Sequence, residues 1–388
     1  MVRRFFSFLG MCALLAACGG TTAITDGGTD ASIEGGDDVI VVDAGPPGTP
    51  IGGLTPGTWT WVDIAGAKCR DGTPTGIGVS LNSASTKVMI FLEGGGACFN
   101  GTTCASNPSH FDSLTFGAQF VPIESKAGIF SRTDTKNTVR DWNMVYVPYC
   151  TGDVHAGSAP DATVPGFPGK QQFVGYANID LALGRLLPTF TGTTQVLLTG
   201  QSAGGFGAAL NYVHVARAFG SAVHVDLIDD SGPLFSNPYM APCLEQNLEQ
   251  LFGLTNTILT DCGSDCSDPA NDMILYWKHL PKTYPEGRFG FMDSAGDSVI
   301  ASFFGFGANN CTGFTAIPPA TYEAGLLDAR NQVAAYSNIG SFLFPGTAHT
   351  SLVASYTTQT AMGGDGGTVL LEDWVTALLG GSATNVGP

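Results

Sequence analysis

The chain has 388 residues, enough for one large α/β domain or two medium-sized ones. Only 13% of the residues are charged, and 16 Lys and Arg against 33 Asp and Glu give a net charge of −17. This acidic balance argues against nucleic acid as a partner, because phosphates require a basic surface. Neutral or cationic partners fit it better.

Residues 1–18, MVRRFFSFLGMCALLAAC, have the pattern of an export signal. Arg3 and Arg4 form a basic start, and the apolar run over 5–17 is too short to span a bilayer comfortably. The run ends in LAAC, which resembles a bacterial lipobox and predicts lipidation of Cys18. An ordinary signal peptide is the alternative. The first interpretation places the protein in the cell envelope on a membrane anchor, and the second predicts secretion.

Residues 19–55 are rich in Gly, Thr, Asp and Pro, and carry six acidic side chains and no basic ones. Such a segment cannot bury enough apolar surface to offset its chain entropy, so it is expected to be a flexible linker. VIVV at 39–42 is its only apolar run and its only candidate strand. With no internal repeat and no second linker, residues 56–388 are expected to form one domain.

Short apolar runs bounded by turn residues recur in this domain, at 88–92, 144–148, 196–199, 223–228, 289–292 and 341–344. Unbroken apolar runs are typical of strands that are buried on both faces, as in a parallel sheet. Segments with a helical pattern accompany them, at 176–188, 203–219, 321–336 and 368–379. The alternation predicts an α/β fold with a doubly wound, mostly parallel sheet.

Outside the signal segment the chain has eight cysteines, at 69, 98, 104, 150, 243, 262, 266 and 311. An even number in an exported chain indicates disulfides, although the sequence does not choose their pairing. Cys262 and Cys266 have the spacing of half a zinc site. Because no second Cys/His pair at metal spacing accompanies them, a local disulfide is favoured. No motif for a metal or a cofactor is found, so neither is expected.

The stretch VLLTGQSAGG, residues 196–205, contains one G-x-S-x-G pattern centred on Ser202. In a chain with 53 glycines so short a pattern is weak by itself. Here a buried-type strand precedes it and a helical segment follows. That arrangement holds a serine on a sharp turn above the carboxyl edge of a sheet, and it predicts Ser202 as a nucleophile.

A serine hydroxyl needs a base to accept its proton, and histidine suits that role at neutral pH. On this type of fold the chain order is serine, acid, histidine. His349 lies in a Gly/Thr loop after the last predicted strand, and it is the expected base. The other five histidines precede Ser202 or lie in helical or strand patterns: His110, His155, His214, His224 and His279.

The acid that orients the imidazolium is expected on a loop at the same edge of the sheet. Asp293 follows the strand at 289–292 and lies just before the final strand, which makes it the expected acid. The Asp229/Asp230 pair follows the run at 223–228 and is the second candidate for the acid, although Asp230 is rather expected to cap or brace the site. Asp297 is a third candidate for the acid and ranks below the other two.

The negative charge that develops on a substrate carbonyl requires preorganised backbone N–H groups. One is expected from Ala203, the residue directly after the nucleophile. Others are expected from Gly94–Gly96, because these glycines follow the strand at 88–92 and a bare backbone can approach a substrate closely.

Seven segments together resemble the pectin acetylesterase/Notum family of serine carboxylesterases. They occur in the family's order and span nearly the whole domain: AKCRDGTPTG (67–76), FLEGGGACFNGTTC (91–104), DWNMVYVPYCTGDVHAGS (141–158), GQSAGGFGAALN (200–211), DDSGP (229–233), FMDSAGDS (291–298) and AHTSL (348–352).

The resemblance implies an α/β-hydrolase-like fold and deacylation of O-acyl esters through an acyl-enzyme. The site residues that it implies are the nucleophile Ser202, the acid Asp293, the base His349 and the oxyanion donors Gly95, Gly96 and Ala203. It also implies two disulfides, Cys98–Cys104 and Cys69–Cys150.

One position departs from the family. Many members carry Trp where this chain has Gly96, so an aromatic wall of the acyl pocket is expected to be missing or supplied by other residues. The leading hypothesis is an exported serine carboxylesterase that removes short O-acyl groups, acetyl above all, from a polysaccharide. The alternatives are a lipase or polyester depolymerase, and a catalytically silent surface binding protein on the same scaffold.

Overall fold

The computed structural model describes residues 39–42 and 45–388. The predicted signal peptide, the lipidation site at Cys18 and the first part of the linker lie outside these residues. No helix in the described part of the chain is long and apolar enough to cross a membrane.

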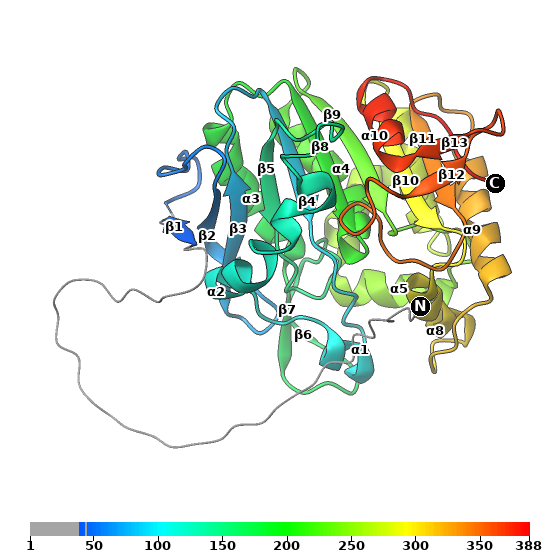
Figure 1. The fold of residues 1–388 in the computed structure, drawn as a ribbon. Helices are drawn as coiled ribbons and strands as arrows, with labels where there is room; N and C mark the ends of the chain where they lie inside the picture. The colour runs from blue at the N-terminus through cyan, green and yellow to red at the C-terminus, as the bar shows by residue number, and fades with distance from the viewer. Residues whose placement is uncertain (1–38, 43–44) are drawn as a thin grey trace, which may run out of the picture. The chain divides into compact units, whose positions relative to one another are not determined.

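A nine-stranded sheet forms the centre of the fold, in the order β1-β2-β3-β5-β4-β8-β9-β10-β11 (Figure 1). Its strands are β1 (Ile40–Val42), β2 (Trp59–Lys68), β3 (Pro74–Ser80), β4 (Lys87–Leu92), β5 (Asn143–Val147), β8 (Gln195–Gln201), β9 (His224–Asp230), β10 (Phe289–Ser294) and β11 (Ile339–Phe344). All neighbours pair in parallel except β3, which is antiparallel to β2 and to β5. The mostly parallel sheet is confirmed.

The α-helices are α1 (Gly101–Ser106), α2 (Ser113–Thr115), α3 (Gly175–Thr189), α4 (Ala203–Phe219), α5 (Pro242–Phe252), α6 (Ile258–Cys262), α7 (Asp272–Thr283), α8 (Ser298–Ala308), α9 (Pro319–Gln332) and α10 (Leu371–Leu379). Two hairpins stand apart from the main sheet: β6 (Ala159–Thr163) with β7 (Lys170–Phe173), and β12 (Thr360–Met362) with β13 (Thr368–Leu370).

Both faces of the sheet are buried, which explains the unbroken apolar runs. Along β4, Ile90 packs into a core with α3, α4 and α7, while the next residue, Phe91, packs into a second core on the other face. That second core is aromatic: Phe91 and Phe130 contact edge to face, and Phe120 stacks on Tyr146. Helix α10 completes this face.

The strand order reverses direction between β4 and β8. From β4 the chain continues to β5 on one side, and from β8 it continues to β9 on the other. Ligands of doubly wound sheets bind at the carboxyl ends of the strands that flank such a switch point. Here those ends lead directly into Glu93 and Ser202.

The predicted linker differs from the structure in its second half. Strand β1 pairs in parallel with β2, with Ile40 opposite Thr60. The buried Arg185 guanidinium of α3 donates to the carbonyl of Gly45, and its Nε donates to the carbonyl of Thr49 (2.9 Å). The folded unit therefore begins before residue 40 rather than at 56, because edge pairing and backbone carbonyls fix a segment that has little apolar surface.

Four disulfides join the eight cysteines of the described residues: Cys69–Cys150, Cys98–Cys104, Cys243–Cys311 and Cys262–Cys266. The two pairs implied by the resemblance and the local pair at 262 and 266 are confirmed. Cys69–Cys150 joins the residue after β2 to the segment after β5, and Cys98–Cys104 joins the loop after β4 to α1.

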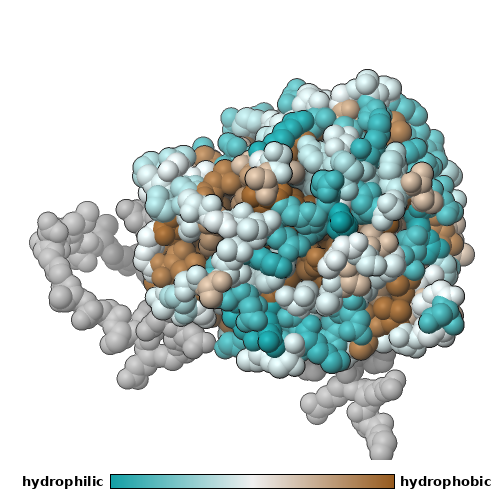
Figure 2. All heavy atoms as spheres, turned by 90° about the horizontal axis from the view of Figure 1, so that it is seen from above, coloured by the Kyte–Doolittle hydropathy of each residue, from teal (hydrophilic) through white to brown (hydrophobic). Residues whose placement is uncertain are grey.

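The surface seen from above in Figure 2 mixes polar areas with small apolar patches. The most exposed large apolar side chains are Leu114 (78%), Ile123 (68%) and Met362 (68%). Exposed apolar residues of this kind are normal on protein surfaces and do not by themselves mark a binding site.

Candidate active site

Ser202 lies on a sharp turn between β8 and α4. Its φ of 57° and ψ of −123° are in a region that side-chain-bearing residues rarely adopt. Its N–H donates to the carbonyl of Asp230 (2.7 Å), which fixes the turn against β9. A Cβ on Gly204 would lie 2.0 Å from the carbonyl oxygen of Leu92, so only glycine lets α4 start this close to β4. The G-x-S-x-G stretch thus folds as a strand–turn–helix elbow.

His349 lies in the loop after β11, and its Nδ1 is 2.6 Å from Oδ2 of Asp297. The other carboxylate oxygen of Asp297 accepts the N–H groups of residues 299 and 300 (2.8 and 3.0 Å), as the N-cap of α8. Asp297 is fully buried and the imidazole is 15% exposed. A carboxylate only accepts hydrogen bonds, so Nδ1 carries the proton and Nε2 is left free to accept one.

Asp293, the expected acid, is not the partner of His349 in the structure. It is fully buried at the end of β10 and accepts hydrogen bonds from the hydroxyl of Tyr322 and the N–H of Ser294 (2.7 Å). Burial, with the nearby charge of Asp297, raises the pKa of Asp293 well above its usual value, which favours the neutral form of this carboxyl. A neutral carboxyl cannot stabilise an imidazolium as a carboxylate does.

Asp230 connects the serine turn to the histidine loop. Its carbonyl accepts the N–H of Ser202, and its Oδ2 accepts the N–H groups of residues 351 and 352 (2.8 and 2.7 Å). Beside it, the hydroxyl of Thr350 donates to Oε1 of Gln201 (3.1 Å). The carboxyl of Asp230, the last residue of β9, therefore links the serine turn to the histidine loop, and burial raises its pKa to about 6.

The glycine run after β4 lies directly against the serine turn. A Cβ on Gly94 would be 2.9 Å from Cβ of Ser202, so the loop passes as close as backbone allows. None of the hydrogen bonds formed within the described part of the chain uses the N–H groups of residues 94–97 as donors. Gly96 and Ala203, two of the three expected oxyanion donors, border the same cavity as Ser202.

That cavity has a volume of about 60 Å³ and extends from Ser202 between α4, α5, α7 and α8. Apart from Ser202, every residue that lines it is apolar or glycine. Five of them are aromatic: Phe99, Phe206, Phe252, Phe303 and Phe304. A Cβ on Gly96 would lie 3.3 Å from Cζ of Phe303, so a ring from α8 stands beside the position where the family's Trp is missing.

His155, which the chain order set aside, is buried next to the glycine run. Its Nε2 lies 2.8 Å from the carbonyl oxygen of Glu93, and because a carbonyl only accepts, Nε2 is the donor. Burial lowers the pKa of His155 to about 4, so the ring is neutral at pH 7. The role that this geometry supports is structural rather than that of a base.

The remaining histidines pair with carboxylates outside the cavity. These pairs are His110 with Asp112, His214 with Asp180, His224 with Asp226, and His279 with Asp265. None of the four histidines lines the cavity at Ser202. Among the residues that the structure describes, no group of three or more His, Cys, Asp or Glu is arranged to hold a metal ion.

An α/β-hydrolase-like sheet with its serine elbow at the switch point defines the fold class of the protein. Residues 58–266, just over half of the chain, match the family model described as Pectinacetylesterase. The chain belongs to the pectinacetylesterase family.

Several relatives of this chain are named as palmitoleoyl-protein carboxylesterases. The palmitoleoyl-protein carboxylesterase NOTUM of Mus musculus is 32% identical over 177 residues, which are 44% of this chain and 34% of that protein. The chain thus spans about a third of the length of this relative. The inactive palmitoleoyl-protein carboxylesterase notum1b of Danio rerio is 36% identical over 104 residues, 26% of this chain and 73% of that protein.

Among solved structures, the Wnt deacylase Notum from Drosophila has a similar fold. The TM-score is 0.62 at 18% sequence identity, and the superposition covers 85% of this chain and 96% of the other. At this identity the likeness concerns the fold alone.

Proposed function

We propose that this protein is a serine carboxylesterase in which Ser202 is the nucleophile, His349 the base and Asp297 the acid that orients it. The observation that carries the proposal is the His349–Asp297 pair on a loop that Asp230 ties to the serine turn. Nucleophile, base and orienting acid must share one edge of the sheet, and these contacts bring the three loops together.

In this mechanism Nε2 of His349 takes the proton of the Ser202 hydroxyl as its oxygen attacks the ester carbonyl. The N–H groups of Gly95, Gly96 and Ala203 stabilise the oxyanion. The ester C–O bond then breaks, and His349 returns the proton to the leaving alcohol. Water, activated by the same histidine, hydrolyses the acyl-enzyme and releases the acid.

The cavity indicates the kind of acyl group. Its lining extends from Ser202 along α5, α7 and α8 and is apolar apart from Ser202, so it offers more apolar surface than an acetyl group covers. An apolar wall gains free energy by burying methylene groups. The proposal is therefore that acyl chains longer than acetyl are the better substrates, which moves the lipase-type alternative ahead of the short-acyl hypothesis.

For the alcohol portion the proposal is a carbohydrate, supported by the description of the family alone. Export, and attachment to a membrane through Cys18, are proposed from the signal-like start of the chain. Four disulfides in the described residues support an oxidising compartment.

The test compares the protein with its Ser202→Ala variant on p-nitrophenyl esters from acetate to decanoate. We expect kcat/KM to rise with chain length and activity to vanish in the variant. Activity that peaks at acetate would favour the short-acyl hypothesis, and activity that survives Ser202→Ala would refute the mechanism.

The silent-binding alternative has one point in its favour, since a relative in this family is named as inactive. Covalent labelling decides it. A competent Ser202 takes up a fluorophosphonate and the Ser202→Ala variant does not, whereas a folded protein that resists labelling and hydrolyses no ester would support the binding role.

A further inference from the structure

The carbonyl oxygens of the loop after β4 are held by three side chains from elsewhere in the chain. Nε2 of His155 donates to the carbonyl of Glu93 (2.8 Å), and Nδ2 of Asn107 donates to that of Gly95 (2.7 Å). The hydroxyl of Tyr149 donates to the carbonyl of Gly96 (2.7 Å). All three side chains are at least nine-tenths buried.

Holding a carbonyl also fixes the direction of an N–H group. In a trans peptide the C=O and the following N–H point in opposite directions. The bond from Asn107 to the Gly95 carbonyl therefore aims the N–H of Gly96 the other way, and the bond from Tyr149 does the same for Ala97. Both residues line the cavity at Ser202, and neither N–H has an acceptor in the described part of the chain.

We propose that Asn107 and Tyr149 are positioning residues for the oxyanion site, which they hold from outside by fixing the peptide planes on both sides of Gly96. The inference rests on the proposed esterase function and extends it to residues that do not touch the substrate. Without these two bonds Gly96, with its φ of 80°, has the freedom of any glycine to turn its N–H away.

The hydroxyl of Tyr149 suits this role because it is itself held in place. It accepts the N–H of Val154 (2.9 Å) while donating to Gly96, so both of its hydrogen-bonding functions are used. Burial raises the pKa of Tyr149 well above its usual value, which keeps the donor proton on the oxygen. The backbone N–H of Tyr149 donates to the carboxyl of Glu93 (2.7 Å), at the start of the same loop.

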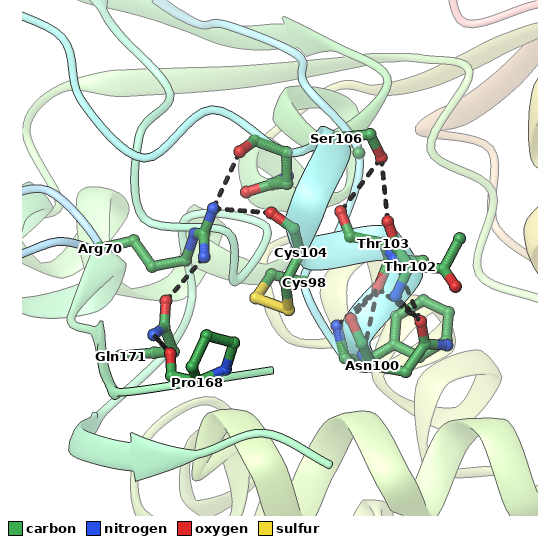
Figure 3. The surroundings of a disulfide bond; sticks show 12 residues. Arg70, Cys98, Asn100, Thr102, Thr103, Cys104, Ser106, Pro168 and Gln171 are labelled. Atoms are coloured by element: carbon green, nitrogen blue, oxygen red, sulfur yellow. Dashed lines mark hydrogen bonds between the residues drawn. A yellow bond between two sulfur atoms is a disulfide. The ribbon is translucent and has the colours of Figure 1, made fainter. Parts of the chain in front are cut away.

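Asn107 is fixed from behind by the surroundings of a disulfide. Its carbonyl and that of Cys104 both accept hydrogen bonds from Nη2 of Arg70 (2.9 Å each), and Nη1 of Arg70 donates to Gln171 (2.6 Å). Figure 3 shows Arg70 reaching toward the short helix α1, which the Cys98–Cys104 disulfide ties to the end of the glycine loop. A network of this kind keeps its members in one geometry.

The test uses Asn107→Leu, which keeps the side-chain volume and removes the donor, and Tyr149→Phe, which removes only the hydroxyl. Losing an oxyanion donor outright costs about 10²–10³ in kcat, so misaiming one is expected to cost about tenfold to a hundredfold. KM for p-nitrophenyl butyrate should stay nearly constant, because the N–H groups act on the transition state. Affinity for a trifluoromethyl ketone should fall by the same factor as kcat/KM.

The matched control is Asn100→Ala at the other end of the same helix. Oδ1 of Asn100 accepts the N–H groups of Thr102 and Thr103 (3.0 Å each), so the variant weakens α1 without touching the loop carbonyls. If the role of Asn107 is only structural, both asparagine variants lower the melting temperature and leave kcat per fluorophosphonate-labelled site unchanged. That result would overturn the inference.

Two further outcomes separate this inference from the function on which it rests. Activity that survives Ser202→Ala removes the esterase mechanism and the inference together. A dead Ser202→Ala variant alongside Asn107→Leu and Tyr149→Phe variants with normal kcat removes only the inference. If Asn107→Leu does not fold, Tyr149→Phe decides alone, because it deletes a single oxygen atom.

Discussion

Two regions meet at Ser202, and the carboxylates of Asp230 and Asp297 in one are held differently from those of Glu245 and Glu249 in the other. At the catalytic edge the carboxylates of Asp230 and Asp297 each accept two backbone N–H groups, and the hydroxyl of Tyr149 uses both of its hydrogen-bonding functions. The cap, residues 242–283, forms a wall of the cavity at Ser202, and it buries carboxyl oxygens that have no partner in the described structure.

Helix α5 of the cap presents one face to the cavity and another to α7. Leu244 and Leu248 of α5 line the cavity, while Glu245 and Glu249 of the same helix are buried away from it, close to Asp272 at the start of α7. Burial is the main cause that raises the pKa of Glu245 to about 8 and that of Glu249 to about 7. This difference suits the proposed reaction. Bond breaking requires rigidly held groups at the edge of the sheet, whereas the acyl chain of the substrate requires only an apolar surface.

The largest effect is expected from the carboxylate that orients the base. Asp297→Asn should lower kcat by about 10⁴, because the amide favours the wrong tautomer of His349. Asp293→Asn should change kcat by less than about tenfold, since an amide resembles the neutral form that burial favours in this carboxyl. Steady-state kinetics on p-nitrophenyl butyrate compares the two.

Asp293→Asn and Asp297→Asn serve as controls for each other, because the two positions lie four residues apart on the same segment. The reverse ranking, with Asp293→Asn inactive and Asp297→Asn active, would show that the histidine pairs with Asp293 during turnover. In that case the loop that carries His349 would have to move during turnover, and the edge of the sheet would not be rigid.

A smaller effect is expected from filling the cavity through the cap. Leu248→Trp should lower kcat/KM for decanoate about 10–200-fold relative to acetate, because displaced methylene groups lose their apolar contacts. Leu251→Trp, one turn along α5 and outside the cavity lining, should leave the ratio unchanged. Equal losses on all chain lengths would mean that the cavity does not hold the acyl chain.

The smallest effect concerns stability and pH in the cap. A carboxyl whose pKa is about 8 when folded and near 4.3 when unfolded binds its proton more tightly in the folded state, so stability falls as pH rises from about 5 to about 8. Glu245→Gln keeps the oxygen that accepts the N–H of Met273 (2.7 Å) and cannot ionise. It should raise the melting temperature by about 1–3 °C at pH 8 and change it little at pH 5.

Thermal unfolding at the two pH values measures this difference, and kcat on p-nitrophenyl butyrate should not change, because Glu245 is not in the cavity lining. Other buried carboxyls with raised pKa values, such as Glu93, contribute equally to the pH dependence of stability in both proteins, so their effect cancels in the comparison. A variant that is less stable at both pH values would show that the carboxylate has a favourable partner.

The sequence predicted best where a pattern is local. Buried parallel strands such as β4 and β8 are continuous apolar runs, and the elbow at Ser202 follows from glycines beside a strand. Strands β2 and β3 were missed because they pair antiparallel and carry exposed or small residues. The cavity was not predictable in this way, because its walls come from helices that are distant in sequence.

Local sequence patterns did not identify which aspartate contacts His349. Asp293 and Asp297 follow the same strand, and which of them faces His349 depends on the turn between them and on the start of α8. A signal was available, since an aspartate directly before the helical run SVIASFF is a typical N-cap. A capped carboxylate is fixed in space, which favours it as an orienting group.

Strand β1 and the Arg185 contacts determine where this protein can be shortened. Removing residues 1–55, as composition alone would suggest, would uncover one side of β2 and leave the buried Arg185 guanidinium without the carbonyls of Gly45 and Thr49. An uncovered, unpaired strand is a template for pairing between copies, so aggregation is the expected result. Residues whose composition is that of a linker therefore also cover the edge of the sheet and prevent pairing between molecules.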